Sequence, residues 1–181
     1  MTDNEPITWD NSVILSWFDF KAEHHVAKFE DAFSVIKYGF TWTVDSEKIG
    51  KEVIFSIKNI KIFPQFFPTL SSVRISEKNE RLLNHEQGCF DLAELVKRKY
   101  FRDIEKIFEG KSYPTRGKNE EQDKQYARED SGKMLNIEIE KLENLFLKEK
   151  SEYQKLTEFG NNSQKQNQYN FEFNKLRISN L

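Results

Sequence analysis

The residues best suited to chemistry lie in one short segment that contains His85, Glu86 and Cys89. His85 and Cys89 are four positions apart, so on a helix they lie about 40° apart and share one face. Imidazole and thiolate groups both bind zinc, and a neighbouring glutamate can act as general base on a metal-bound water. The spacing therefore makes His85 and Cys89 candidate metal ligands and Glu86 a candidate base.

The same face of this helix is predicted to be buried, because Leu92 and Val96 continue the stripe of His85 and Cys89. A four-position pattern is weak evidence by itself, since a histidine on a buried stripe is more often a hydrogen-bonded core residue than a ligand. Cys89 is interpreted as a core residue or a weak ligand, because it has no clear cationic neighbour apart from His85.

The elements that must position this segment are predicted from hydrophobic periodicity. Residues 13–17 form a short apolar run of strand-forming types, and residues 31–44 and 52–63 alternate between apolar and polar side chains. These three segments are predicted to be strands, with a hairpin connection at 45–50. Pro64 and Pro68 are predicted to end regular structure, because proline cannot donate to a strand ladder.

Helical spacing begins near Glu77 and extends to Phe108. A polar loop at 110–119, a charged helix at 120–158 and a last helix at 164–177 follow. We therefore expect a single α+β domain over residues 1–181, β-rich over 1–76 and helical over 77–181. Its N-terminal antiparallel sheet would pack on the His85 helix, with two further helices after it.

Composition excludes several classes of function. The net charge of -2 argues against a nucleic-acid-binding protein, although 32% of the residues are charged. No apolar run reaches the roughly 20 residues that span a membrane. Cys89 is the only cysteine, so no internal disulfide forms. The polar N-terminus lacks the pattern of a secretory signal, which predicts a cytoplasmic protein; a signal peptide missing from the sequence is the alternative.

Segments in three parts of the chain carry a family resemblance. The first is Leu15-Ser16-Trp17-Phe18-Asp19-Phe20. The second is Leu83-Asn84-His85-Glu86-Gln87-Gly88-Cys89-Phe90-Asp91-Leu92-Ala93-Glu94-Leu95, continuing to Arg98. The third is Tyr153-Gln154-Lys155-Leu156-Thr157-Glu158-Phe159-Gly160, followed by Gln166 and Tyr169. Together they resemble a bacterial family described as secreted zinc-dependent proteases, the domain of unknown function family 922. The resemblance implies a zinc-peptidase helix with His-Glu-x-x-His.

The chain departs from the family pattern at its metal-associated positions. The second histidine of the helix is replaced by Cys89, and an aspartate of the third segment is replaced by Gln154. The histidine that the resemblance implies as third zinc ligand is replaced by Phe159, which cannot bind a metal. Catalytic zinc needs three protein ligands and an open position for water. The substitutions therefore predict loss of a metal site, with His85 and Glu86 as its remnants.

The leading functional hypothesis is a catalytically degenerate, zinc-metalloprotease-like protein that holds no cofactor and acts as a non-catalytic protein-binding or regulatory module. One alternative is an active zinc peptidase with His85 and Cys89 as ligands and a third ligand from His24, His25 or Glu94. Glu94 is a poor candidate, because it lies about 180° around the helix from His85. A further alternative is a structural or assembly subunit. No nucleic-acid or membrane partner is expected.

Overall fold

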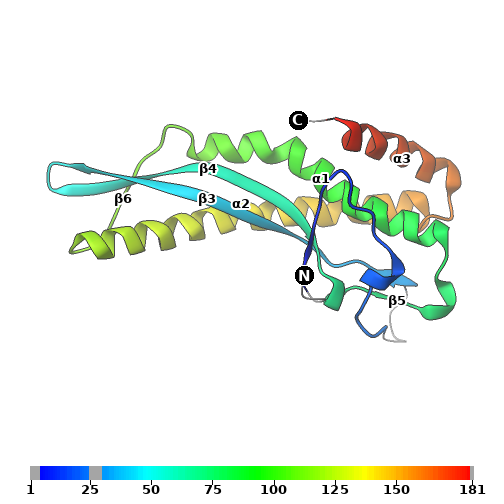
Figure 1. Cartoon of the computed structure of the whole chain (residues 1–181). Coiled ribbons are helices and arrows are strands. Elements are labelled where there is room, and N and C mark those ends of the chain that lie inside the picture. Colours follow the sequence, from blue (N-terminus) through cyan, green and yellow to red (C-terminus); the bar gives the residue numbers. More distant parts are fainter. Residues whose placement is uncertain (1–4, 25–29, 180–181) are drawn as a thin grey trace.

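Two long antiparallel strands, β3 (Ile36–Ile49) and β4 (Glu52–Phe66), form the main hairpin of the protein (Figure 1). The computed structural model describes residues 5–24 and 30–179. The connection predicted at 45–50 is too long, because pairing continues to Ile49 opposite Glu52. Gly50 has a φ of +64°, a backbone conformation that glycine adopts without steric cost, so the turn closes within two residues.

The prediction that Pro64 ends regular structure is wrong. β4 continues through Pro64, which pairs with Tyr38 of β3. At this position the backbone N–H of Tyr38 points away from β4 and donates to Glu143 Oε1 at 3.3 Å. The ladder therefore does not need the N–H that proline lacks. The prediction is also wrong at Pro68: β4 has already ended at Phe66, and Pro68 begins a short 3₁₀ helix (Pro68–Leu70), where the first residue does not need its N–H.

Short strands complete the β-rich part. β1 (Ile7–Thr8) and β6 (Tyr113–Pro114) both pair with β4, and β2 (Ala32–Phe33) pairs with β5 (Ser72–Val73) in a separate two-stranded sheet. The strand predicted at 31–44 is thus divided between two sheets. The strand predicted at 13–17 is absent; Leu15 is buried there, but its N–H donates to the side chain of Gln87 at 2.7 Å instead of to a strand.

The helical part follows the predicted order: α1 (Glu80–Phe108), α2 (Glu120–Thr157) and α3 (Ser163–Ile178). An asparagine side chain caps the N-terminus of each helix, and the capping residues are Asn79, Asn119 and Asn162. α1 begins at Glu80 instead of near Glu77, because residues Ile75–Glu77 form a short 3₁₀ turn. None of the helices in the described residues is long and apolar enough to cross a membrane.

The fold is α+β, with the antiparallel sheet packed against three helices. α1 is central, since it contacts β4, α2 and α3 (Figure 1). The core between these elements consists of aromatic and aliphatic side chains, including Phe55, Phe66, Phe90, Val96, Leu135, Leu142 and Phe146. The predicted buried stripe on α1 is confirmed, because Leu92 and Val96 are buried with His85 and Cys89.

Side chains of α2 cover the outer edge of β3 and the residues just before it. Lys150 Nζ donates to the Ser34 carbonyl at 2.8 Å, and Arg128 Nη1 donates to the Trp42 carbonyl at 3.0 Å. Between them, Glu143 accepts from the Tyr38 N–H. An edge strand presents unpaired backbone groups that can pair with other chains, and α2 provides polar partners for several of them.

Candidate functional site

The inward face of α1 carries the three residues singled out from the sequence. His85 and Cys89 are fully buried, and Glu86 is 1% exposed. Their burial follows from the position of α1 between the sheet and the other two helices, because these residues fall on the stripe that packs inward. Chemistry at this face would therefore take place inside the core, without an open approach from solvent.

His85 is held by residues of the third family-like segment. The ring of Tyr153 stacks on the imidazole at a centroid distance of 4.7 Å and an interplanar angle of 4°. Nδ1 of His85 lies 3.2 Å from both Thr157 Oγ1 and Gln166 Oε1. Thr157 donates its own hydroxyl hydrogen to the Tyr153 carbonyl at 2.7 Å, so its oxygen accepts from His85. These contacts assign the proton of a neutral imidazole to Nδ1.

The environment of His85 keeps the ring neutral. Burial lowers its pKa to about 4, because the charged form would lose its hydration in the core, and Lys150 and Arg81 lower it further; the contact with Gln166 partly opposes the shift. With the proton on Nδ1, Nε2 carries a lone pair. Nε2 is buried and has no hydrogen-bond partner among residues 5–24 and 30–179. A neutral imidazole with a free Nε2 is chemically capable of binding a metal.

Close packing explains two glycines around His85. A Cβ at Gly88 would overlap the hydroxyl of Tyr153, so glycine allows the tyrosine to approach α1. Gly160 has a φ of +85°, and a Cβ there would lie 3.1 Å from the Cβ of His85. The chain thus passes close to the histidine on both sides, and larger residues would push α1 away from α2.

Glu86 is directed toward the β-rich part. It accepts a hydrogen bond from the hydroxyl of Ser34, and Lys150 donates to the carbonyl of the same serine. Burial raises the pKa of Glu86, and the positive charge of Lys150 partly opposes that rise. Glu86 is therefore engaged in a buried polar cluster with Ser34 and Lys150.

Cys89 does not offer a thiolate. Burial and the nearby carboxylate of Glu86 raise the pKa of its thiol, so the protonated form persists at neutral pH. The expectation that Cys89 is buried is confirmed. Binding a metal here would first require loss of a proton from a thiol in an unfavourable environment.

The described candidates for a third ligand, His24 and Glu94, do not assemble around His85. Glu94 is buried but pairs with Lys97 at 2.7 Å and Arg98 at 2.8 Å. His24 Nδ1 lies 3.4 Å from Ser72 Oγ, and His25 is outside the described residues. Within residues 5–24 and 30–179, no group of three or more His, Cys, Asp or Glu side chains is placed to hold a metal ion. The donors in the described part of the chain therefore do not form a three-ligand zinc site.

Phe159 and Gln154, two of the three positions at which this chain departs from the family pattern, have different surroundings. Phe159 packs on His85 with ring centroids 5.9 Å apart, and its side chain is 39% exposed. It therefore covers part of the imidazole at the surface. Gln154 lines a separate recess with Lys150 and Ser34. Of these two residues, Phe159 is the one whose ring packs against the histidine.

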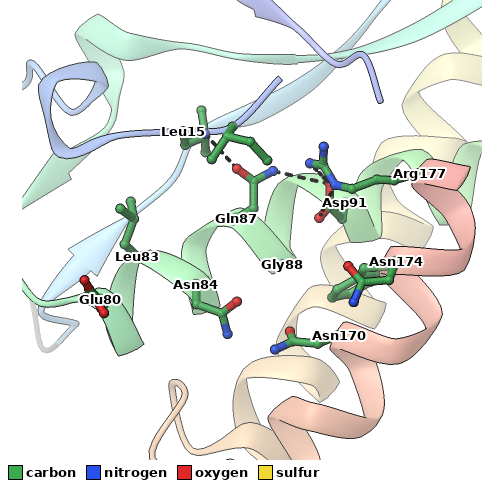
Figure 2. A pocket seen from close by; sticks show the side chains of 12 residues that line it. Leu15, Glu80, Leu83, Asn84, Gln87, Gly88, Asp91, Asn170, Asn174 and Arg177 are labelled. Carbon is green, nitrogen blue, oxygen red and sulfur yellow. Dashed lines mark hydrogen bonds and ion pairs between the residues drawn. The ribbon is translucent and has the colours of Figure 1, made fainter. Parts of the chain in front are cut away.

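The outer side of α1 borders a groove of about 360 Å³ (Figure 2). The groove lies between α1, α3 and the loop around Leu15, and its polar lining consists of Glu80, Asn84, Gln87, Asp91, Asn170, Asn174 and Arg177. Its apolar lining consists of Ile14, Leu15, Leu83, Gly88 and Phe173. The same segment of α1 thus supplies both the buried cluster and the wall of a groove that is open to solvent.

An ion pair holds the end of this groove together. Asp91 accepts from Arg177 Nε at 3.1 Å and from Trp9 Nε1 at 2.8 Å. Arg177 also donates to the carbonyls of Asn11 and Val13 at 2.9 and 3.0 Å. Asp91 and Arg177 therefore join the N-terminal loop, α1 and α3. Asp91 belonged to the family-like segment, but nothing in the sequence identified Arg177 or Trp9 as its partners.

Comparisons with known proteins give no match: no family model, no curated protein and no solved structure matches this chain. The function proposed below therefore rests on the residues and their contacts.

Proposed function

We propose that this chain is a non-catalytic protein-binding module whose scaffold resembles that of the zinc-dependent proteases described above. The observation that carries the proposal is the enclosure of His85 and Glu86, which are at most 1% exposed and have no third ligand among the described residues. The partner we propose is a protein, not a nucleic acid or a membrane. We also propose that the protein is cytoplasmic, because a single, buried Cys89 suits a reducing compartment.

Contacts between the family-like segments support the proposed resemblance to a zinc-protease scaffold. Tyr153, Thr157 and Gln166 of the third segment all contact His85. The first segment joins the same helix, because the N–H of Leu15 donates to Gln87. Residues that the resemblance alone selected in the third segment thus lie around one histidine, as expected of a former metal site that is now filled by packing.

One observation favours the alternative of an active zinc peptidase. Nε2 of His85 has a lone pair and no partner among the described residues, and Nδ1 is fixed by Thr157 and Gln166. Metal-binding histidines are commonly fixed in this manner through their other ring nitrogen. A third alternative, a structural or assembly subunit, has no specific contact in its favour.

Zinc content and proteolysis distinguish these functions. We expect the purified protein, incubated with excess zinc and then desalted, to hold far less than one equivalent by elemental analysis. We also expect casein cleavage no greater than that of the Glu86→Gln variant. Stoichiometric zinc together with Glu86-dependent cleavage would overturn the proposal.

A rebuilt site tests whether the cluster descends from a metal site. The double variant Cys89→His, Phe159→His restores the two family-like histidines beside His85. We expect it to bind zinc in an indicator competition assay, whereas the wild type and the single variant Phe159→His bind much more weakly. If the double variant keeps its circular dichroism spectrum but gains no zinc affinity, the idea of a former metal site is wrong.

A further inference from the structure

We infer that the groove between α1 and α3 binds an extended peptide segment carrying a cationic side chain. The inference rests on the proposed protein-binding function and names the class of partner. At about 360 Å³, the groove is above the roughly 300 Å³ at which ligand pockets begin. Figure 2 shows Asn84 of α1 and Asn170 and Asn174 of α3 near Gly88, across the space between the helices.

The amide groups of the groove are available for a ligand. The side chains of Asn84 and Asn174 are exposed and make no hydrogen bond within residues 5–24 and 30–179. Asn170 uses only its oxygen, which accepts from Gln166 Nε2 at 2.9 Å. A carboxamide offers an acceptor and two donors, the same groups that a peptide backbone presents. Amides on two facing helices can therefore pair with successive peptide groups of an extended chain.

The walls of the groove are already ordered. Gln87 accepts from the Leu15 N–H at 2.7 Å and donates to Asp91 at 3.3 Å. Arg177 joins Asp91 to the N-terminal loop, and its side chain is 12% exposed. Binding to a preformed wall costs less conformational entropy than binding that must first order a loop.

The charged residues of the groove lining determine which charge a ligand should carry. Asp91 and Arg177 neutralise each other in a nearly buried pair. Glu80 is exposed and has no ion-pair or hydrogen-bond partner among the described residues, so the lining has one uncompensated negative charge. A lysine or arginine side chain complements this carboxylate.

Other classes of ligand suit the groove less well. A nucleic-acid or phosphorylated partner would meet the negative charge of Glu80 without a free cation opposite it. A saccharide would find no aromatic face, because the only ring in the lining, Phe173, is 3% exposed. Ile14 is 68% exposed at the rim and Leu83 is half-buried, so aliphatic side chains of a peptide have apolar surface to contact.

Peptide titration by NMR tests the inference. The probe is acetyl-Leu-Lys-Leu-amide, with acetyl-Leu-Glu-Leu-amide as its charge-reversed control, added to ¹⁵N-labelled protein. We expect saturable shifts of the side-chain amide resonances of Asn84 and Asn174. The lysine peptide should bind roughly 2- to 5-fold more tightly, as expected of an exposed ion pair.

Matched variants assign the effect to the groove. Glu80→Gln should remove the preference for lysine, whereas Glu121→Gln, a change in the first turn of α2 outside the groove, should retain it. The double variant Asn84→Ala, Asn174→Ala should weaken both peptides by roughly 5-fold or more, through loss of hydrogen bonds. The control variant Asn144→Ala, on the exposed surface of α2, should leave the affinity for both peptides unchanged.

The titration distinguishes failure of the groove inference from failure of the proposed function. If no resonance shifts saturably at peptide concentrations up to roughly 10 mM, the groove inference is wrong. Saturable binding that maps to another surface also overturns the groove but agrees with the proposed function. Cleavage of the peptide in the same sample, seen by mass spectrometry, would instead overturn the proposed function itself.

Discussion

The two sides of the 84–91 segment of α1 differ in what they expose. On the inner side His85, Glu86 and Cys89 have reactive groups, but all are buried against α2 or the β-rich part. On the outer side Asn84 has an unreactive amide that faces an open groove. Adjacent residues of one helix therefore divide into enclosed reactive groups and accessible non-reactive ones. The accessible groups are suited to recognition, whereas the enclosed groups contribute to packing.

The largest expected effect comes from breaking the ion pair that borders the groove. Asp91→Ala leaves Arg177 nearly buried without its counter-charge, which should lower the free energy of unfolding by about 3–5 kcal/mol. Glu172→Ala, which breaks an exposed pair with Lys175, is the control and should cost less than about 1 kcal/mol. Urea denaturation measures both. Equal effects would show that the outer wall is not fixed by Asp91.

The next effect is the acid sensitivity of the inner side. Burial lowers the pKa of His85 to about 4 from its ordinary value of 6.5, so the unfolded chain binds the proton first as pH falls. Above pH 6.5, His85 is neutral in both the folded and the unfolded protein, and its burial costs no proton. As pH falls from about 6.5 to 4, protonation of the unfolded chain lowers the free energy of unfolding by ~3 kcal/mol in total. Urea denaturation of the wild type and His85→Gln over this range should show the loss only in the wild type.

Glu86 provides a control of opposite sign. Burial raises its pKa in the folded state, so the folded protein binds this proton more readily than the unfolded chain. Relative to Glu86→Gln, the wild type should therefore gain stability as pH falls toward the unfolded pKa. If the wild type instead loses stability relative to Glu86→Gln over that range, the carboxyl group is not buried as described.

A smaller effect is expected at Phe159, which covers His85 but has a φ of +54°. Phe159→Ala loses the ring contact and keeps the unfavourable backbone conformation. Phe159→Gly loses the same contact but relieves the strain, so it should be more stable than the alanine variant by about 1 kcal/mol. Thermal unfolding of the two variants compares them directly. An alanine variant at least as stable as the glycine variant would contradict the left-handed conformation.

The smallest effect is expected for the groove amides. Asn84→Ala and Asn174→Ala remove side chains that have no partner in the described part of the protein, so stability should change by less than about 0.5 kcal/mol. Chemical denaturation measures this change. A larger loss would mean that the amides support the fold and are not free for a ligand.

Much of the fold follows from local patterns in the sequence. The alternation around Val53, Phe55 and Ile57 predicted β4, and helical spacing of apolar residues predicted the order of the three helices. The failures occur where a non-local contact decides the structure. The apolar residues near Leu15 resemble a strand, but a hydrogen bond to Gln87 replaces the ladder. Pro64 is tolerated in β4 because Tyr38 directs its N–H toward α2.

The inner cluster was predictable only in part. Helical spacing placed His85 and Cys89 on one buried stripe, and the family resemblance selected Tyr153 and Thr157, which contact the histidine. The partners of Glu86 were not predictable, because Ser34 lies 52 positions away and no local pattern links the two residues. The groove was missed for the same reason, since its walls come from α1 and α3 and its rim from the N-terminal loop.

The covering of β3 by α2 has a consequence for refolding. The β3–β4 hairpin consists of neighbouring residues and can form early, whereas Lys150 and Arg128 reach its edge from 116 and 86 positions away. Until α2 docks, the strand edge is open to pairing between molecules. The yield of refolded monomer should therefore decrease as protein concentration rises, and α2 acts within the chain as a protective partner of the hairpin.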